Sequence, residues 1–181
     1  MLQKVGVMSK AMIEVADEVL VRRARAGDGA AFADFARRWW PLIGRFAWSM
    51  LGNASQAVEV TEEVIGTVLV APQAPDIPVR RFMYRLTIWR AIVRRHSSTC
   101  AVPPASPILQ ALDRLGRMER AAFLLRDVEQ LSLAETAAIL ESPAAQVQAQ
   151  VHRARVLLTH LLGDLANSLD LDFGYPVRRT A

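Results

Sequence analysis

The sequence predicts an all-α protein of two small helical domains joined by a proline-containing linker, the C-terminal domain being a helix-turn-helix. Hydrophobic residues recur at three- and four-residue steps along most of the 181 residues. No strand-like alternation of useful length interrupts them, and prolines gather near the middle of the chain. Because 52% of the residues are hydrophobic and 22% are charged, the chain can bury a core.

The N-terminal domain is predicted to span residues 17–96, after an extension of residues 1–16. Helical periodicity begins near Asp17, and Gly27-Asp28-Gly29 separates a short first helix from a longer second one. Pro41 lacks a backbone donor, so we expect it to kink the second helix or to mark a restart.

Two further helices complete this domain. Leu51-Gly52-Asn53 indicates a helix stop, and Ser55 is expected to cap a third helix. Three prolines within residues 72–78 end the third helix, and a fourth is expected over 79–96. Residues 97–107 hold three more prolines and lack apolar periodicity, which is typical of an exposed linker.

The C-terminal domain is predicted to span residues 108–165, followed by a tail of residues 166–181. Its periodicity indicates four helical segments, Ile108–Leu115, Arg117–Asp127, Leu133–Leu140 and Ala144–Leu165.

The third and fourth of these segments have the pattern of a helix-turn-helix. Ser132 and Glu135 form a capping box that fixes where the third segment begins. Pro143 suits the first turn of the fourth segment. The fourth segment is expected to bury four residues at helical spacing, Val147, Val151, Ala154 and Leu158.

The opposite side of the fourth segment is polar, and glutamine and arginine can pair with base edges in a major groove. A solvated helical hairpin would show the same spacing. Residues 101–181 carry 8 Lys/Arg against 9 Asp/Glu, a net of −1, so we expect weak DNA affinity from this domain alone. The outward polar residues are Gln146, Gln148, Gln150, His152, Arg153 and Arg155.

The predicted fourth helix of the N-terminal domain is strongly basic. Arginines with interleaved aromatics are typical of single-stranded nucleic-acid binding, and we expect Tyr84 to be the most exposed aromatic. The alternative is that Phe82, Leu86, Trp89 and Val93 form a core face. With no acidic residue in this helix, repulsion among the arginines favours a polyanionic partner. They are Arg80, Arg81, Arg85, Arg90, Arg94 and Arg95.

Three stretches carry a family resemblance. Residues 115–132, with the continuation to His152-Arg153-Ala154-Arg155, resemble the C-terminal domain of extracytoplasmic-function (ECF) sigma factors of the sigma-70 family. Residues 20–28 resemble the opening helix of that family, and 82–86 fall where it has its promoter-melting helix. The resemblance spans roughly residues 17–162.

The resemblance implies an all-helical factor that takes core RNA polymerase to promoter DNA, with an anti-sigma factor as a further partner. It implies −35 contacts from Gln146, Gln148, Ala149, Gln150, His152 and Arg153. It implies −10 contacts from Arg81, Tyr84, Arg85, Trp89, Arg90 and Arg94. It implies polymerase contacts from Glu59, Glu62 and Glu63.

Some positions depart from the family pattern. Ile88-Trp89 replaces an Arg-Asn pair in the −10 helix, and Gln148 and Gln150 stand where basic residues are common. Glu141 occupies a turn position usually filled by glycine, where a positive φ costs ~1 kcal/mol or more. These changes indicate an unusual promoter or weakened activity.

The leading hypothesis is therefore a cytoplasmic, non-enzymatic transcription initiation factor. The alternative is a sigma-like interaction protein that binds polymerase or an anti-sigma factor without initiating transcription. A stand-alone repressor lacks a recognisable ligand pocket or dimerisation helix. One cysteine and three scattered histidines give no metal or catalytic spacing, so we expect no metal, no cofactor and no enzymatic activity. The longest uncharged stretch is too short to insert in a membrane.

Overall fold

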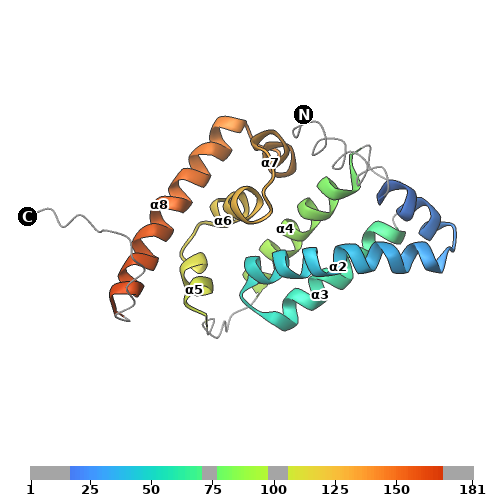
Figure 1. Ribbon diagram of the computed structural model, residues 1–181, viewed down its shortest axis with the longest axis horizontal. Coiled ribbons are helices and arrows are strands. Elements are labelled where there is room, and N and C mark those ends of the chain that lie inside the picture. The colour runs from blue at the N-terminus through green and yellow to red at the C-terminus, as the bar shows by residue number, and fades with distance from the viewer. Residues whose placement is uncertain (1–16, 71–76, 98–105, 169–181) are drawn as a thin grey trace, which may run out of the picture.

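The computed structural model describes residues 17–70, 77–97 and 106–168, and the regular elements in these ranges are all helical. The all-α prediction is confirmed (Figure 1). The predicted extension, most of the predicted linker and residues 169–181 lie outside the described residues. The elements are a helix over residues 17–25, α2 (Gly29–Leu51), α3 (Ala54–Val70), α4 (Val79–Ser97), α5 (Pro107–Asp113), α6 (Arg117–Phe123), the π-helical turn η1 (Leu124–Val128), α7 (Leu133–Leu140) and α8 (Ala144–Ser168).

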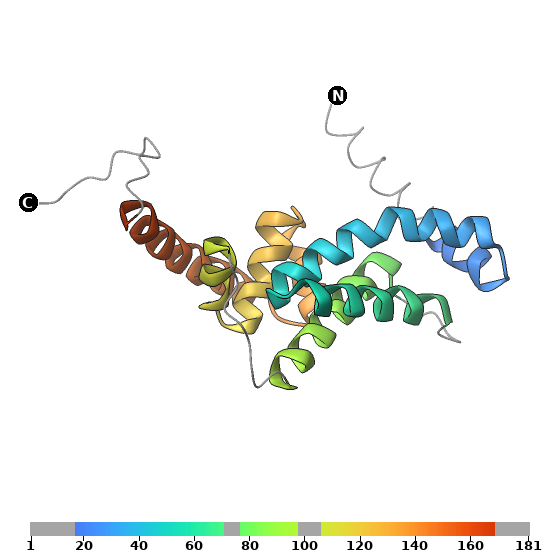
Figure 2. The same ribbon diagram turned by 90° about the horizontal axis from the view of Figure 1, so that it is seen from below.

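Helices α2, α3 and α4 pack against one another to form the N-terminal half (Figure 2). The side chain of Asp28 accepts the N–H groups of Ala30 and Ala31 at 3.0 and 3.1 Å and so begins α2. This helix runs through Pro41 as one element, so no restart occurs. Its buried face supplies much of the core, including Phe35, Trp39, Ile43, Phe46 and Met50.

The junction between α2 and α3 agrees with the predicted stop but not with the predicted cap. Gly52 takes the left-handed conformation at φ 70° and ends α2. The side chain of Asn53 accepts the N–H of Gln56 at 3.0 Å, so α3 begins at Ala54 and Ser55 lies inside it. Asparagine caps as well as serine does, and it comes first along the chain.

Helix α4 buries a different face from the one that its aromatic spacing suggested. Val79, Met83, Ile88 and Ala91 are in the core, whereas Trp89 is 65% exposed. Hydrophobic residues lie on both sides of this helix, and packing against α2 and α3 decides which side is buried. The interpretation of Phe82, Leu86, Trp89 and Val93 as the core face is therefore wrong: Phe82 and Leu86 are only partly buried, and Trp89 and Val93 are exposed.

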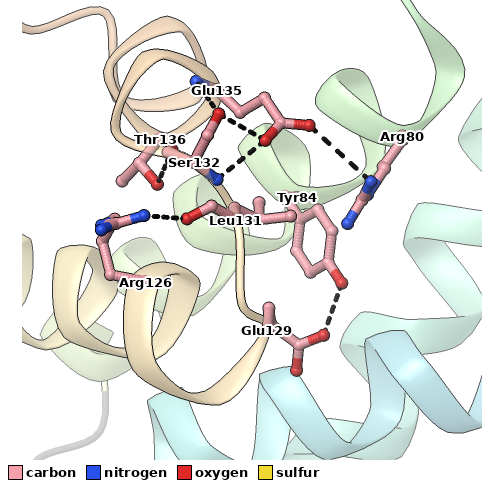
Figure 3. Close-up of polar contacts among 8 residues, drawn as sticks. All are labelled: Arg80, Tyr84, Arg126, Glu129, Leu131, Ser132, Glu135 and Thr136. Atoms are coloured by element: carbon pink, nitrogen blue, oxygen red, sulfur yellow. Dashed lines mark hydrogen bonds and ion pairs between the residues drawn. The ribbon is translucent and has the colours of Figure 1, made fainter. Parts of the chain in front are cut away.

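The C-terminal half is built on the predicted helix-turn-helix. Ser132 Oγ accepts the Glu135 N–H at 3.2 Å, and Glu135 Oε2 accepts the Ser132 N–H at 2.8 Å, so the capping box is present as predicted (Figure 3). Helix α7 has the predicted bounds, and Glu141 ends it in the left-handed conformation at φ 50°. The four residues predicted as the core of α8 are all buried, Val147, Val151, Ala154 and Leu158.

The segment before the helix-turn-helix differs from the single helix predicted for residues 117–127. Helix α6 ends at Phe123 and continues as the wider turn η1, after which the Glu129 N–H donates to the Leu124 carbonyl at 2.9 Å. The next residue, Gln130, has φ 57°. Together these features turn the chain sharply between α6 and α7.

Gln130→Gly is expected to raise the free energy of unfolding by up to about 1 kcal/mol, because a left-handed backbone costs a side-chain residue roughly that much. Chemical denaturation of the two proteins measures the change. Gln130→Ala serves as the control, since alanine retains the backbone strain and removes the same side chain, whose amide donates to the Asp127 carbonyl at 2.9 Å. Equal stabilities of the glycine and alanine variants would contradict the expectation.

The two halves lie against each other, with α4 packed on α7. In Figure 1, α4 stands between α2 and the α6–α7 region. The buried hydrophobic side chains of both halves form one continuous cluster. The surfaces predicted to contact DNA therefore have to be located relative to this junction.

Candidate nucleic-acid interface

The N-terminal half of α8 presents a polar face to solvent. The left-handed turn at Glu141 and the start of the helix at Ala144 direct this half away from α7, while Val147 and Val151 anchor the other side. Five of the six residues predicted for −35 contacts are exposed on it, Gln146, Gln148, Ala149, His152 and Arg153.

Gln150, the sixth, is not on this face. It is 6% exposed, and its Oε1 atom is buried without a hydrogen-bond partner among the described residues. Its neighbour Val151 is buried as well, so Gln150 belongs to the inner side of α8. The interpretation of Gln150 as a base-contacting residue is not compatible with this arrangement.

Two arginines of α8 are held by carboxylates of the same half. Arg153 Nε donates to Glu119 Oε1 at 2.7 Å, and Arg155 Nη2 donates to Asp127 Oδ1 at 2.6 Å. Both arginine side chains remain more than half exposed, at 57% and 54%. Since exposed ion pairs are weak, Arg153 can exchange its carboxylate for a phosphate or a base edge, whereas Arg155 lies on another side of α8.

The arginines of α4 are compensated by carboxylates from other helices, contrary to the expectation of an uncompensated run. Arg94 contacts Glu59 and Glu63 of α3, and Arg90 lies 3.6 Å from Glu63. Arg80 pairs with Glu135, Arg85 with Glu141 and Arg95 with Asp113. Repulsion within α4 therefore gives no independent reason for a polyanion to bind.

Trp89 and Arg90 lie on the exposed side of α4, and Trp89 is the most exposed of the four tryptophans. Tyr84 is 2% exposed, so the expectation that it is the exposed aromatic is wrong. Its hydroxyl donates to Glu129 Oε2 at 2.7 Å (Figure 3). Burial, followed by the hydrogen bond to Glu129, raises the pKa of Tyr84 above its ordinary value. Arg81 is partly buried.

The predicted polymerase contacts lie on α3 beside the α4 arginines. Glu62 is exposed, and Glu59 and Glu63 pair with arginines of α4. One continuous charged surface thus combines the residues predicted for polymerase binding with two residues predicted for −10 binding, Arg90 and Arg94. A protein that contacts Glu59 and Glu63 would compete with Arg94 for these carboxylates.

The residues that join the two halves were not predicted from the sequence. Glu129 accepts from Tyr84 and from Arg45 Nη2, which is 2.9 Å away. Arg120 is 2% exposed and donates to the Ser49 carbonyl at 2.7 Å. No local sequence pattern identifies these residues, because their partners are distant in sequence. The separation is 84 positions for Arg45 and Glu129, 45 for Tyr84 and Glu129, and 71 for Ser49 and Arg120.

Asp113 lies at the same junction, between Arg120 and Arg95, at 2.6 and 2.9 Å. Partial burial acts to raise the pKa of Asp113, but the hydrogen bonds and charges of the two arginines outweigh it and hold that pKa below its ordinary value. For Arg120, burial lowers the pKa of the guanidinium.

Residues 17–70, 77–97 and 106–168 contain no group of three His, Cys, Asp or Glu side chains placed to hold a metal ion. In the same part of the chain, no helix is both long enough and apolar enough to cross a bilayer.

Comparison with known proteins gives a consistent picture. The family model for sigma-70, region 4, matches residues 106–158. The ECF RNA polymerase sigma factor SigW of Bacillus subtilis (strain 168) is 24% identical over an alignment of 180 positions, and the match covers 80% of this chain and 96% of that protein.

Two solved structures share the fold. The structure of CnrH in complex with the cytosolic domain of CnrY matches with a TM-score of 0.68 and 21% identity, covering 82% of this chain and 98% of that one. The sigma factor RpoE, in complex with the anti-sigma factor NepR from Bartonella quintana, matches with a TM-score of 0.59 and 17% identity, covering 72% and 97%.

Proposed function

We propose that this chain is a sigma-70 family protein of the ECF type, which directs core RNA polymerase to specific promoters and thereby initiates transcription. The observation that carries the proposal is the exposed face of Gln146, Gln148, Ala149, His152 and Arg153 at the start of the second helix of a helix-turn-helix. That end of such a helix is the part that enters a major groove.

We assign −35 recognition to this face of α8. Glutamine pairs bidentately with adenine, and arginine pairs with guanine or holds phosphate. Since the C-terminal half carries a net charge of −1, nonspecific attraction to DNA is weak there, and stable binding depends on polymerase and on the N-terminal half.

We assign −10 contacts to the exposed side of α4. Trp89 offers a ring for stacking on an unpaired base, and Arg90 and Arg94 offer charge for the phosphates beside it. Glu62, with Glu59 and Glu63, offers an acidic surface on α3 for polymerase. Polymerase binding there competes with Arg94 for the two carboxylates, which couples the two contacts.

Run-off transcription with core polymerase and the DNA upstream of the protein's own gene tests the proposal. A transcript of defined length that needs both this protein and core polymerase supports promoter-specific initiation. Binding to core polymerase without any transcript favours the sigma-like interaction protein instead. That alternative draws support from Tyr84 and Arg85, whose side chains already donate hydrogen bonds to Glu129 and to the Ala138 carbonyl in this structure.

Arg153→Ala is expected to weaken binding of the polymerase complex to −35 DNA by roughly 5- to 150-fold, because one arginine–base contact contributes about 1–3 kcal/mol. Arg155→Ala is the matched control, since Arg155 has a similar exposure and its own carboxylate partner but lies on another side of α8. Fluorescence anisotropy with labelled promoter DNA measures both. Equal losses for the two variants would remove Arg153 from the recognition face.

The remaining assignments follow from the same role. We propose an N-terminal domain over residues 17–96, a linker over 97–107 and a −35 domain over 108–165. The protein acts without enzymatic activity of its own, in the cytoplasm where core polymerase is found. The CnrH and RpoE structures contain CnrY and an anti-sigma factor, so an anti-sigma factor is also a fitting partner for this chain.

A further inference from the structure

We infer that Arg95, Arg117 and Arg120 form a binding site for a small phosphorylated molecule, in a pocket where α4, α5 and α6 meet. The pocket has a volume of about 430 Å³, which is in the range of sites that hold small organic ligands. None of the residues that line it belongs to the surfaces assigned to DNA or polymerase. The inference therefore stands apart from the proposed function.

The charges around the pocket are unbalanced. Three arginines line it, and Asp113 is the one acidic residue that lines it in the described part of the chain, so the net charge of the lining is +2. Arg95 Nη1 and Arg120 Nη1 both donate to the same oxygen, Asp113 Oδ1, at 2.9 and 2.6 Å. Glu119 of α6 is held at 2.7 Å by an arginine of α8. One carboxylate does not neutralise three guanidinium groups, so the pocket attracts an anion.

Arg120 supplies a buried donor that needs a partner. Its side chain is 2% exposed; Nε donates to the Ser49 carbonyl at 2.7 Å and Nη1 to Asp113, whereas Nη2 has no hydrogen-bond partner among the described residues. Leaving an N–H of a buried charged group unpaired is costly. Burial lowers the pKa of Arg120, the hydrogen bond to Asp113 opposes this effect, and the charge of Arg95 lowers the pKa further. A negative charge in the pocket would stabilise this guanidinium.

A phosphate group matches these donors better than other common anions do. Guanidinium groups bind phosphate through paired N–H donors, and the several oxygens of one phosphate can accept from more than one arginine at once. The backbone of a DNA strand cannot approach Arg120 closely, because that side chain is buried, whereas the end of a small molecule can enter a pocket.

The wall of the pocket indicates that the phosphate group carries an organic portion. Met50, Ile92 and Leu115 come from α2, α4 and the turn before α6, and their apolar side chains line the same pocket as the arginines. Pockets that combine apolar walls with a few charged groups are typical of sites for small organic ligands. A nucleoside phosphate has both parts, a charged end and a flat ring system.

Isothermal titration calorimetry on the full-length chain, without DNA or polymerase and at ~0.15 M ionic strength, tests the inference. ADP and inorganic pyrophosphate are expected to bind at one site per chain, and adenosine, which lacks the phosphates, is expected not to bind. Tighter binding of ADP than of pyrophosphate supports an organic phosphate as the ligand. Adenosine binding as tightly as ADP, or no binding of either phosphate compound, overturns the site.

Arg117→Ala is expected to weaken ADP binding about 10-fold, the lower end of what a charge-assisted hydrogen bond contributes, since Arg117 is exposed. Arg114→Ala is the matched control: it removes the same charge three positions earlier, but Arg114 is exposed and does not line the pocket. Its effect is expected to stay within about twofold, because distant charges are screened. Equal losses for the two variants would mean attraction to general surface charge and would overturn the site.

Arg120→Lys tests the buried donor, because lysine keeps the positive charge and lacks the planar fork of N–H groups. It is expected to weaken ADP binding by about 10-fold or more. Unchanged binding by a variant that keeps its helical circular dichroism overturns the role of Arg120. If this variant does not fold, Arg95→Lys replaces it, since the Arg95 side chain is 28% exposed. Displacement of ADP by single-stranded oligothymidine would assign the pocket to a nucleic-acid backbone and would also overturn the site.

Discussion

Arg120→Ala is expected to lower the free energy of unfolding by about 3–5 kcal/mol, because it truncates a buried side chain and removes its charge-assisted hydrogen bonds. Arg120 is 2% exposed and joins the end of α2, through the Ser49 carbonyl, to Asp113 of α5. The substitution leaves a cavity, an unpaired carbonyl and a carboxylate with one fewer cation. Urea denaturation followed by circular dichroism measures the loss.

Arg114→Ala is the control for this variant, since Arg114 lies one residue after Asp113 and is exposed. It is expected to change stability by no more than about 0.5 kcal/mol. A loss for Arg120→Ala no larger than that of the control would show that the buried guanidinium contributes nothing to stability.

The same substitution is expected to alter the pH dependence of stability. The pKa of Asp113 is lowered in the folded protein, so its ionised form stabilises the fold above the pKa of the unfolded chain, and this contribution is lost as the pH falls through the folded pKa. Without Arg120 the folded pKa of Asp113 moves back up, and acid costs the variant less stability than it costs the parent protein.

Trp89→Ala is expected to weaken binding of single-stranded −10 DNA by the polymerase complex by roughly 5- to 150-fold, since stacking of one base on an aromatic ring contributes about 1–3 kcal/mol. Trp89 is 65% exposed on α4 and contributes little to the core. The substitution therefore leaves the free energy of unfolding nearly unchanged. Electrophoretic mobility shifts with −10 oligonucleotides measure the binding.

Trp48→Ala is the matched control for Trp89, because Trp48 is 41% exposed on α2 and is outside the assigned DNA surface. Its loss is expected to leave DNA binding within about twofold. If both variants bind −10 DNA equally well, Trp89 does not stack on a base and the −10 assignment of α4 fails.

Features set by neighbouring residues were predictable from the sequence. The capping box of Ser132 and Glu135 begins α7 where expected, and Gly52 ends α2. In α8, the spacing of Val147, Val151, Ala154 and Leu158 identified the buried side because polar residues fill the other side. The cap of α3 was assigned to Ser55 rather than Asn53, since either residue type caps a helix and local pattern does not separate them.

Features set by distant residues were not predictable from the sequence. Helix α4 has hydrophobic residues on both sides, so only its packing against α2 and α3 buries Met83 and exposes Trp89. The burial of Tyr84 depends on Glu129, 45 positions away, and on Arg45 beside it. The carboxylates that pair with the α4 arginines likewise come from α3, α5 and α7. The sequence of α4 alone does not reveal these partners.

The ion pairs between α4 and α7 give ionic strength a second point of action on this protein besides the DNA-contacting surface. Arg85 with Glu141 and Arg80 with Glu135 are screened by added electrolyte, which favours separation of the halves. The same ions compete with phosphate for the arginines and weaken DNA binding. Added electrolyte therefore acts both on the junction of the two halves and on the DNA-contacting arginines, and thermal denaturation at several ionic strengths measures the first effect without DNA.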